Sequence, residues 1–315
     1  MQLVGVTELC VFRKRDYDTD NARTRYRDRA PAGVSRAKES LMTYKSILLS
    51  LDIDGHFIPL IKLAIDLAKR FDARLIGFSA ADIHLPLASA EGMAFDGEIM
   101  VRQRENIERR LDELRKEFEE LAGAAAVDME WRGAVGNPTR LLIDAARAAD
   151  LVVTGSPEGA SVRNVHRSID LGSLVLQAGR PMLVASNGQE HFLVNRVIVA
   201  WKETREARRA VADAIPFLQK AKEVRLITID KDATDETWNG LTDVVAFLSH
   251  HGVKAAADVF PEKPDGQAIA DLAKVMGADL IISGAYGHSR VREWVFGGAT
   301  RSLLENDGLN RFMSN

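Results

Sequence analysis

The chain has 315 residues, of which 46% are hydrophobic and 28% are charged. It is therefore long enough for two domains, and its composition excludes a disordered, collagen-like or disulfide-rich protein. The 42 Lys and Arg nearly balance the 45 Asp and Glu, and the net charge of -3 creates no general field that would attract nucleic acid or an anionic membrane. Cys10 is the single cysteine, and no apolar run approaches the roughly 18 residues that span a bilayer. We expect a cytoplasmic protein with no nucleic-acid or membrane partner.

Residues 1–41 differ in composition from the rest of the chain. Residues 1–40 hold nine Lys or Arg and six Asp or Glu, and the arginine-rich middle of this segment offers no apolar residues at helical or strand spacing. Such a segment cannot bury enough surface to offset the entropy cost of ordering, so we expect a disordered tail. Met42 follows directly, and we favour a misassigned start upstream of it over a targeting peptide.

After the tail, short apolar runs alternate with amphipathic patterns. We predict strands near 46–52, 73–79, 126–132, 150–155, 181–186, 196–201, 223–230, 253–260, 279–284 and 309–314. Helical stripes follow the first strand of each half, at Leu60, Leu63, Ala64, Leu67 and Ala68, and at Ala207, Ala210, Val211, Ala214 and Leu218. The longest helical pattern, 97–122, is expected to lie on its own sheet, with a coiled-coil contact to another subunit as the alternative. The last run, 309–313, is polar for a buried strand, and we expect it to fray or to lie at a sheet edge.

The two halves of the chain repeat one another. The segment ADLVVTG at 149–155 matches ADLIISG at 278–284, 129 residues later. Apolar strands separated by helices indicate parallel sheets that are covered on both faces. The sequence therefore predicts an α/β fold of two tandem doubly wound domains, 42–190 and 191–315. Each has an open, mostly parallel five-stranded sheet with helices on both faces. We expect the domains to pack as an intramolecular pair about a pseudo-two-fold axis, with a homodimer as a further alternative.

Glycines follow the predicted strand at 279–284. Two residues separate Gly284 from Gly287, and nine residues separate Gly287 from Gly297. Gly298 and Thr300 come next. Glycines at a strand exit let the backbone approach a ligand, and free N–H groups at a helix N-terminus suit phosphates. The intervening loop adds the polar side chains of His288, Ser289 and Arg290. There is no Walker A pattern, and no G-x-G-x-x-G follows either first strand, which disfavours P-loop hydrolysis and ordinary dinucleotide binding.

In these residues the sequence resembles the universal stress protein family, in its tandem two-domain form, over roughly residues 42–315. The family's nucleotide motif is glycine, two residues, glycine, nine residues, glycine, and then Ser or Thr. Gly284, Gly287 and Gly297 match it at full spacing, Gly298 replaces the hydroxyl residue, and Thr300 is a candidate substitute. The resemblance also implies an acidic residue at the end of the first strand that helps hold the adenosine part of ATP. The second copy has Lys202 at this position.

The first copy departs from the motif in the opposite way. It keeps the strand-end acid as Asp52, and Gly172 and Ser173 stand before a helix. The spacing from Gly155 through Gly159 to Gly172 is three and twelve residues instead of two and nine. Each copy therefore retains what the other has lost.

Two residues make the first copy the poorer candidate for binding a triphosphate. Pro157 removes a backbone donor, and Glu158 adds negative charge where phosphates would lie. We therefore predict the nucleotide site in the second domain, on the loop from Gly284 to Thr300, with charge added by Arg290 and Lys202. Weaker first-domain candidates are Asp52, Gly155, Gly172 and Ser173.

The resemblance implies a stress-responsive protein that binds an adenine nucleotide, ATP, with Mg²⁺ only as carried by ATP, and that regulates an unidentified protein partner. No catalytic motif and no metal-ligand spacing is present, so slow ATP hydrolysis is the most that an enzyme interpretation allows. The alternative is a degenerate interaction or dimerisation module that no longer binds nucleotide. Lys202, Pro157 and Glu158 favour this alternative, whereas the glycine spacing at 284–297 favours nucleotide binding.

Overall fold

The computed structural model describes residues 43–55, 57–84, 97–156, 164–261, 266–285, 303–304 and 308–315. The chain divides into the units 1–41 and 42–315, and all the described residues belong to the second. The tail for which we predict disorder lies outside the described residues. Within the described residues, no helix is both long enough and apolar enough to cross a membrane.

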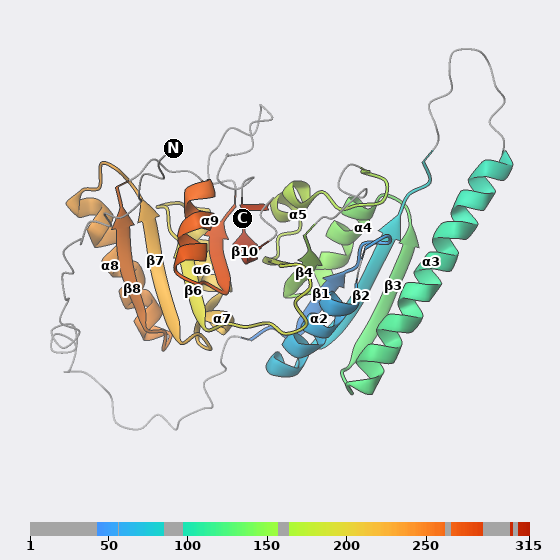
Figure 1. Cartoon of the computed structure of the whole chain (residues 1–315), viewed down its shortest axis with the longest axis horizontal. Coiled ribbons are helices and arrows are strands. Elements are labelled where there is room, and N and C mark those ends of the chain that lie inside the picture. The colour runs from blue at the N-terminus through green and yellow to red at the C-terminus, as the bar shows by residue number, and fades with distance from the viewer. Residues whose placement is uncertain are drawn as a thin grey trace, which may run out of the picture. The chain divides into compact units, whose positions relative to one another are not determined.

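Ten strands form one mixed sheet (Figure 1). They are β1 (Ser46–Ser50), β2 (Arg74–Ala81), β3 (Met129–Val135), β4 (Leu151–Gly155), β5 (Met182–Ala185), β6 (Arg196–Ala200), β7 (Glu223–Ile229), β8 (Ala255–Phe260), β9 (Leu280–Gly284) and β10 (Asn310–Ser314). All ten predicted strands are present, with ends displaced by at most three residues. The order is β3-β2-β1-β4-β5-β10-β9-β6-β7-β8, so each half has the same internal order. Only β5 and β10, which join the halves, pair antiparallel.

Helices cover both faces of the sheet. They are α2 (Ile58–Phe71), α3 (Gly97–Ala124), α4 (Pro138–Ala145), α5 (Leu171–Gln177), α6 (Arg205–Asp213), α7 (Ile215–Leu218), α8 (Asp235–His250) and α9 (Gly266–Val275), with a short 3-10 turn η1 (Ala146–Ala148). Alternate strand residues point to opposite faces, so the core divides in two. One cluster packs under α2, α3, α6, α7 and α8, and the other under α4, α5 and α9. The α/β prediction with both faces covered is therefore confirmed.

The apolar stripes decide which face each helix buries. All the predicted stripe residues of the first and second copies are buried except Leu60, which is partly buried. The long helix α3 lies on its own sheet, as expected, because Leu111, Leu114 and Phe118 are buried against β2 and β3. Its first turns expose Ile99 and Val101.

The expectation that the last strand frays or lies at an edge is wrong. β10 lies in the middle of the sheet between β5 and β9, and all five of its residues are buried. Its two most polar residues, Asn310 and Arg311, are tolerated because they have partners. Asn310 Nδ2 donates to Oε1 of Gln189 at 3.0 Å and to the carbonyl of Asp279 at 3.0 Å, while its Oδ1 accepts the Ser186 N–H at 2.9 Å.

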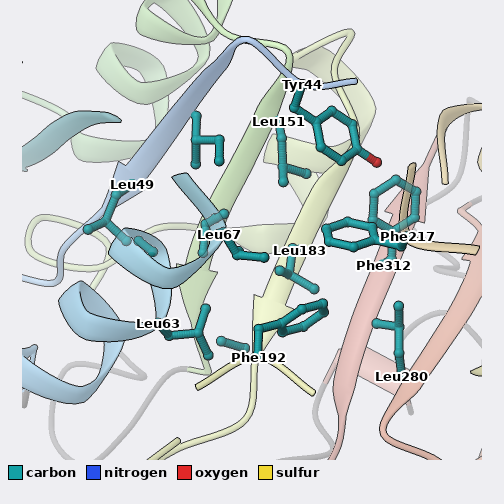
Figure 2. Close-up of a cluster of buried hydrophobic side chains, with 14 of the residues drawn as sticks. Tyr44, Leu49, Leu63, Leu67, Leu151, Leu183, Phe192, Phe217, Leu280 and Phe312 are labelled. Carbon is teal, nitrogen blue, oxygen red and sulfur yellow. The ribbon is translucent and has the colours of Figure 1, made fainter. Parts of the chain in front are cut away.

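An aromatic cluster joins the two halves on one face of the sheet (Figure 2). The Phe217 ring of α7 lies 5.3 Å from Tyr44, 5.4 Å from Phe71, 5.1 Å from Phe192 and 5.7 Å from Phe312, measured between ring centroids. Tyr44 and Phe71 belong to the first half, whereas Phe217 and Phe312 belong to the second. The two halves therefore share one continuous core as well as one sheet.

Candidate functional site

An open pocket of about 410 Å³ lies at the carboxyl ends of β1 and β4. In the order β3-β2-β1-β4-β5, the chain continues from β1 to β2 on one side, and β4 pairs with β1 on the other. Ligands of open α/β sheets bind at such a switch point, outside the carboxyl ends of the strands. The volume falls within the range of about 300–1,000 Å³ that is typical of small-molecule sites. We call this cavity the first-half pocket.

Two hydroxyl residues lie where the strands end in this pocket. Ser50 of β1 and Thr154 of β4 are register partners, they line the pocket, and they are 1% and 6% exposed. Among the described residues, the Oγ of Ser50 has no hydrogen-bond partner. A buried polar atom without a protein partner is rare and is usually satisfied by water or a ligand.

The loop after β1, residues 51–57, carries Asp52 into the pocket wall. The Asp52 carboxylate accepts the N–H of Asp54 at 2.9 Å, which closes a tight turn. From α3, Arg110 Nε donates to the carbonyl of Ile53 at 3.0 Å, and its guanidinium lies 5.3 Å from the centre of the Phe57 ring. These contacts hold the loop in a defined conformation.

A bidentate ion pair crosses from this loop to the segment before α5. Arg167 lines the pocket, and its Nε and Nη2 donate to the two carboxylate oxygens of Asp54 at 2.5 and 2.7 Å. The hydrogen bond from Arg167, followed by its charge, lowers the pKa of the Asp54 carboxyl below its usual 3.8 although partial burial opposes this shift. Bidentate pairs of this kind fix geometry as well as charge.

The N-terminus of α5 is capped from within the chain. Asp170 accepts the N–H of Gly172 at 3.0 Å and the hydroxyl of Ser173 at 2.6 Å, and its own N–H donates to Thr139 Oγ1 at 2.9 Å. Gly172 and Ser173 are the donors that the sequence suggested for phosphates. In the structure these donors bind the carboxylate of Asp170.

The second half of the chain also reaches the first-half pocket, through β10. Arg311, which is 1% exposed, donates from Nη2 to the Oγ of Ser156 and from Nη1 to the carbonyl of Leu303. Asn310 holds Ser186 and Gln189, and Ser156, Ser186 and Gln189 all line the pocket. Asn310 and Arg311 are not among the site candidates predicted from the sequence. The unusual polarity of this strand was the signal that could have identified them.

Two of the second-half candidates, Lys202 and Gly284, lie at the ends of β6 and β9, which are neighbouring strands. Lys202 follows β6 at the position where Asp52 follows β1. Gly284 ends β9, and a Cβ added there would lie 2.5 Å from the Ala207 backbone nitrogen and 2.6 Å from the Glu206 carbonyl carbon. The backbone that approaches Gly284 closely is therefore that of α6. The remaining candidates, namely Gly287, His288, Ser289, Arg290, Gly297, Gly298 and Thr300, lie outside the described residues.

Of the candidates in the first half, the structure brings Asp52 and Gly155 together in the wall of the pocket. A Cβ added at Gly155 would lie 3.5 Å from a methyl group of Leu60, which is an ordinary contact. Gly172 and Ser173 lie at the start of α5, directly after the lining residue Leu171.

Comparison with known proteins gives a family for this part of the chain. The model of the universal stress protein family matches residues 43–173, less than half of the 315 residues but the whole of β1 to β4. A search of curated proteins finds no significant match.

Comparison with solved structures extends the likeness in fold to the second half. A universal stress protein from Archaeoglobus fulgidus DSM 4304 is 17% identical, with a TM-score of 0.65, and the match covers 86% of this chain and 96% of that chain. A putative universal stress protein from Pseudomonas aeruginosa UCBPP-PA14 is 13% identical, with a TM-score of 0.55, and covers 86% of this chain and 93% of that chain. Residues 43–173 therefore match the universal stress protein family, and the second half of the chain repeats the strand order of the first.

Proposed function

We propose that the protein is a stress-responsive, cytoplasmic regulator that binds an adenine nucleotide in the first-half pocket and is not a dedicated catalyst. The observation that carries this proposal is the pocket itself, about 410 Å³ in volume, at the switch point of the domain that matches the family model. The adenine ligand comes from the family resemblance, which assigns the adenosine part to an acid at the end of the first strand. Asp52 stands at this position and lines the pocket.

The chemistry of the pocket walls supports a ligand with both apolar and hydroxyl groups. Phe57, Leu60, Ile169 and Leu171 supply apolar parts of the pocket wall. Ser50 offers a buried hydroxyl that has no partner among the described residues. Convergence of a few polar groups in an otherwise apolar cavity is typical of small-molecule sites.

The glycine loop from Gly284 to Thr300 is the second candidate site, because it matches the family's nucleotide motif at full spacing. The close approach of α6 to Gly284 gives this glycine a packing role that needs no ligand. For this reason we rank the first-half pocket above the second-half loop.

Calorimetric titration of adenine nucleotides into the full chain tests the proposal. We expect binding by the parent protein and at least a tenfold loss, about 1.4 kcal/mol, in Leu60→Asp, which places a charge in the apolar wall. Leu193→Asp is the matched control, because Leu193 is 53% exposed and lies outside the pocket. Gly287→Asp tests the second-half loop.

Three outcomes would separate the hypotheses. Loss of binding in Leu60→Asp alone would support the first-half pocket. Loss in Gly287→Asp alone would move the site to the second half. A parent protein that binds no adenine nucleotide at millimolar concentration would favour the degenerate interaction module.

A further inference from the structure

We infer that the first-half pocket takes an adenosine ligand of low charge, the nucleoside or its monophosphate, and discriminates against the triphosphate. This inference rests on the proposed function and specifies its ligand class. It follows from the charges and hydrogen-bond donors that the described residues of the pocket present, and from which of these donors the chain already occupies.

Arg167 is the one cationic side chain among the described residues that line the pocket. Its Nε–H and one Nη2–H group already donate to the carboxylate of Asp54, at 2.5 and 2.7 Å. A phosphate would therefore meet a guanidinium whose charge is paired with a carboxylate, and its negative charge would also lie near the carboxylate of Asp52, whose field acts on Arg167. Among the described lining residues, a chain of three phosphates thus finds no cation outside an ion pair.

The hydrogen-bond donors at the start of α5 are already in use. Asp170 lies between two lining residues, Ile169 and Leu171, and accepts both the Gly172 N–H and the Ser173 hydroxyl. A carboxylate thus occupies the donors that the family motif would offer to phosphates. It also places a fixed negative charge at this side of the pocket, and like charges repel a polyanion.

Neutral polar side chains are the groups that remain for a ligand. The polar lining is dominated by neutral hydroxyls and amides, including Ser50, Thr154, Ser168, Asn187 and Gln189. Such groups recognise ribose hydroxyls and the polar edge of a base without a net charge on the ligand. Hydroxyls match a nucleoside, whereas a triphosphate requires Arg, Lys or free backbone N–H groups.

Titration of adenosine, adenosine monophosphate and ATP, the last with and without Mg²⁺, tests the inference on the full chain. The binding that Leu60→Asp removes is assigned to the first-half pocket. For this component we expect adenosine and the monophosphate to bind within about tenfold of each other, and ATP at least tenfold more weakly than either. In Asp170→Asn, the ratio of the affinities for the monophosphate and for ATP should fall by several-fold. The reason is that the amide oxygen still caps Gly172 while the negative charge is removed.

Asp144→Asn is the matched control, because Asp144 is an exposed acid of α4 that pairs with Arg147 and does not line the pocket. It should leave all three affinities unchanged. ATP binding more tightly than the monophosphate, in the component that Leu60→Asp removes, would overturn the inference and leave the proposed function standing. If Asp170→Asn prefers the monophosphate over ATP as strongly as the parent protein does, Asp170 does not repel the triphosphate. Failure of all three ligands to bind would overturn the inference together with the proposed function.

Discussion

The loop between β1 and α2 has seven residues, 51–57, whereas the equivalent loop between β6 and α6 has four, 201–204. In the first half the longer loop leads the chain around a pocket before α2 begins. In the second half α6 begins almost at once, and its backbone packs against the end of β9 at Gly284. Among the described residues, two copies of one topology thus differ in the loop that follows the first strand, at the place where such folds bind ligands.

The largest expected effect is on the stability of the fold when alanine replaces the glycine that ends β9 or β4, Gly284 or Gly155. Gly284→Ala should lower the free energy of unfolding by about 1–3 kcal/mol, because the new Cβ would overlap the backbone of α6, which cannot move aside as a side chain would. Gly155→Ala, its counterpart at the end of β4, should change stability by less than about 0.5 kcal/mol. Urea unfolding of both variants measures the difference. Equal effects would mean that the two strand ends are equally open.

Asn310 gives a second way to sharpen the comparison, because it belongs to the second half but holds two residues of the first-half pocket. Asn310→Leu leaves the Ser186 N–H and Gln189 without this partner, so the wall that they form should become less ordered. We expect roughly a tenfold rise in the Kd for an adenine ligand, about 1.4 kcal/mol, measured by calorimetry.

Phe312→Leu is the control for Asn310, since it alters the same strand without touching residues 186–189. It should reduce stability, as expected for loss of aromatic packing, while the Kd stays near that of the parent protein. If both variants weaken binding in proportion to their loss of stability, Asn310 has no positioning role.

The smallest expected effect concerns the ion pair between Asp54 and Arg167, of which Arg167 lines the first-half pocket. Because the pKa of Asp54 is lowered in the folded protein, the pair stabilises the fold fully above pH 3.8, and this contribution is lost as pH falls through the lowered pKa. Asp54 and Arg167 side chains are 46% and 32% exposed, so the contribution should be below about 1 kcal/mol. NMR titration of the carboxyl carbon should give a pKa below 3.8 that returns toward it in Arg167→Gln. An identical pKa in both proteins would exclude the pair in solution.

Much of the fold was predictable because strands and helices follow local periodicity. The runs at 46–52 and 196–201 and the stripes that follow them needed only the pattern of apolar residues. The place of β10 was not predictable in this way. The polar residues Asn310 and Arg311 argue against burial when considered alone. They become favourable only when Ser186 and Gln189, which follow β5, and Ser156, which follows β4, supply hydrogen-bond partners.

The candidate site could be predicted only in part. The family resemblance points to Asp52 and Gly155 as candidates, and the structure brings them to one pocket. The pairing of Arg167 with Asp54, 113 residues apart in the sequence, depends on the tertiary fold, and so does the capping of Gly172 in place of a phosphate. The prediction for the loop from Gly284 to Thr300 stays a prediction, since only Gly284 is described.

Hydrogen exchange followed by mass spectrometry, with and without a saturating adenine nucleotide, tests the central claim most directly. Binding in the first-half pocket should slow amide exchange in peptides that cover 51–57 and 164–172 and leave the peptide over 201–207 unchanged. Protection confined to peptides of the second half, above all those that cover 284–300, would contradict the account.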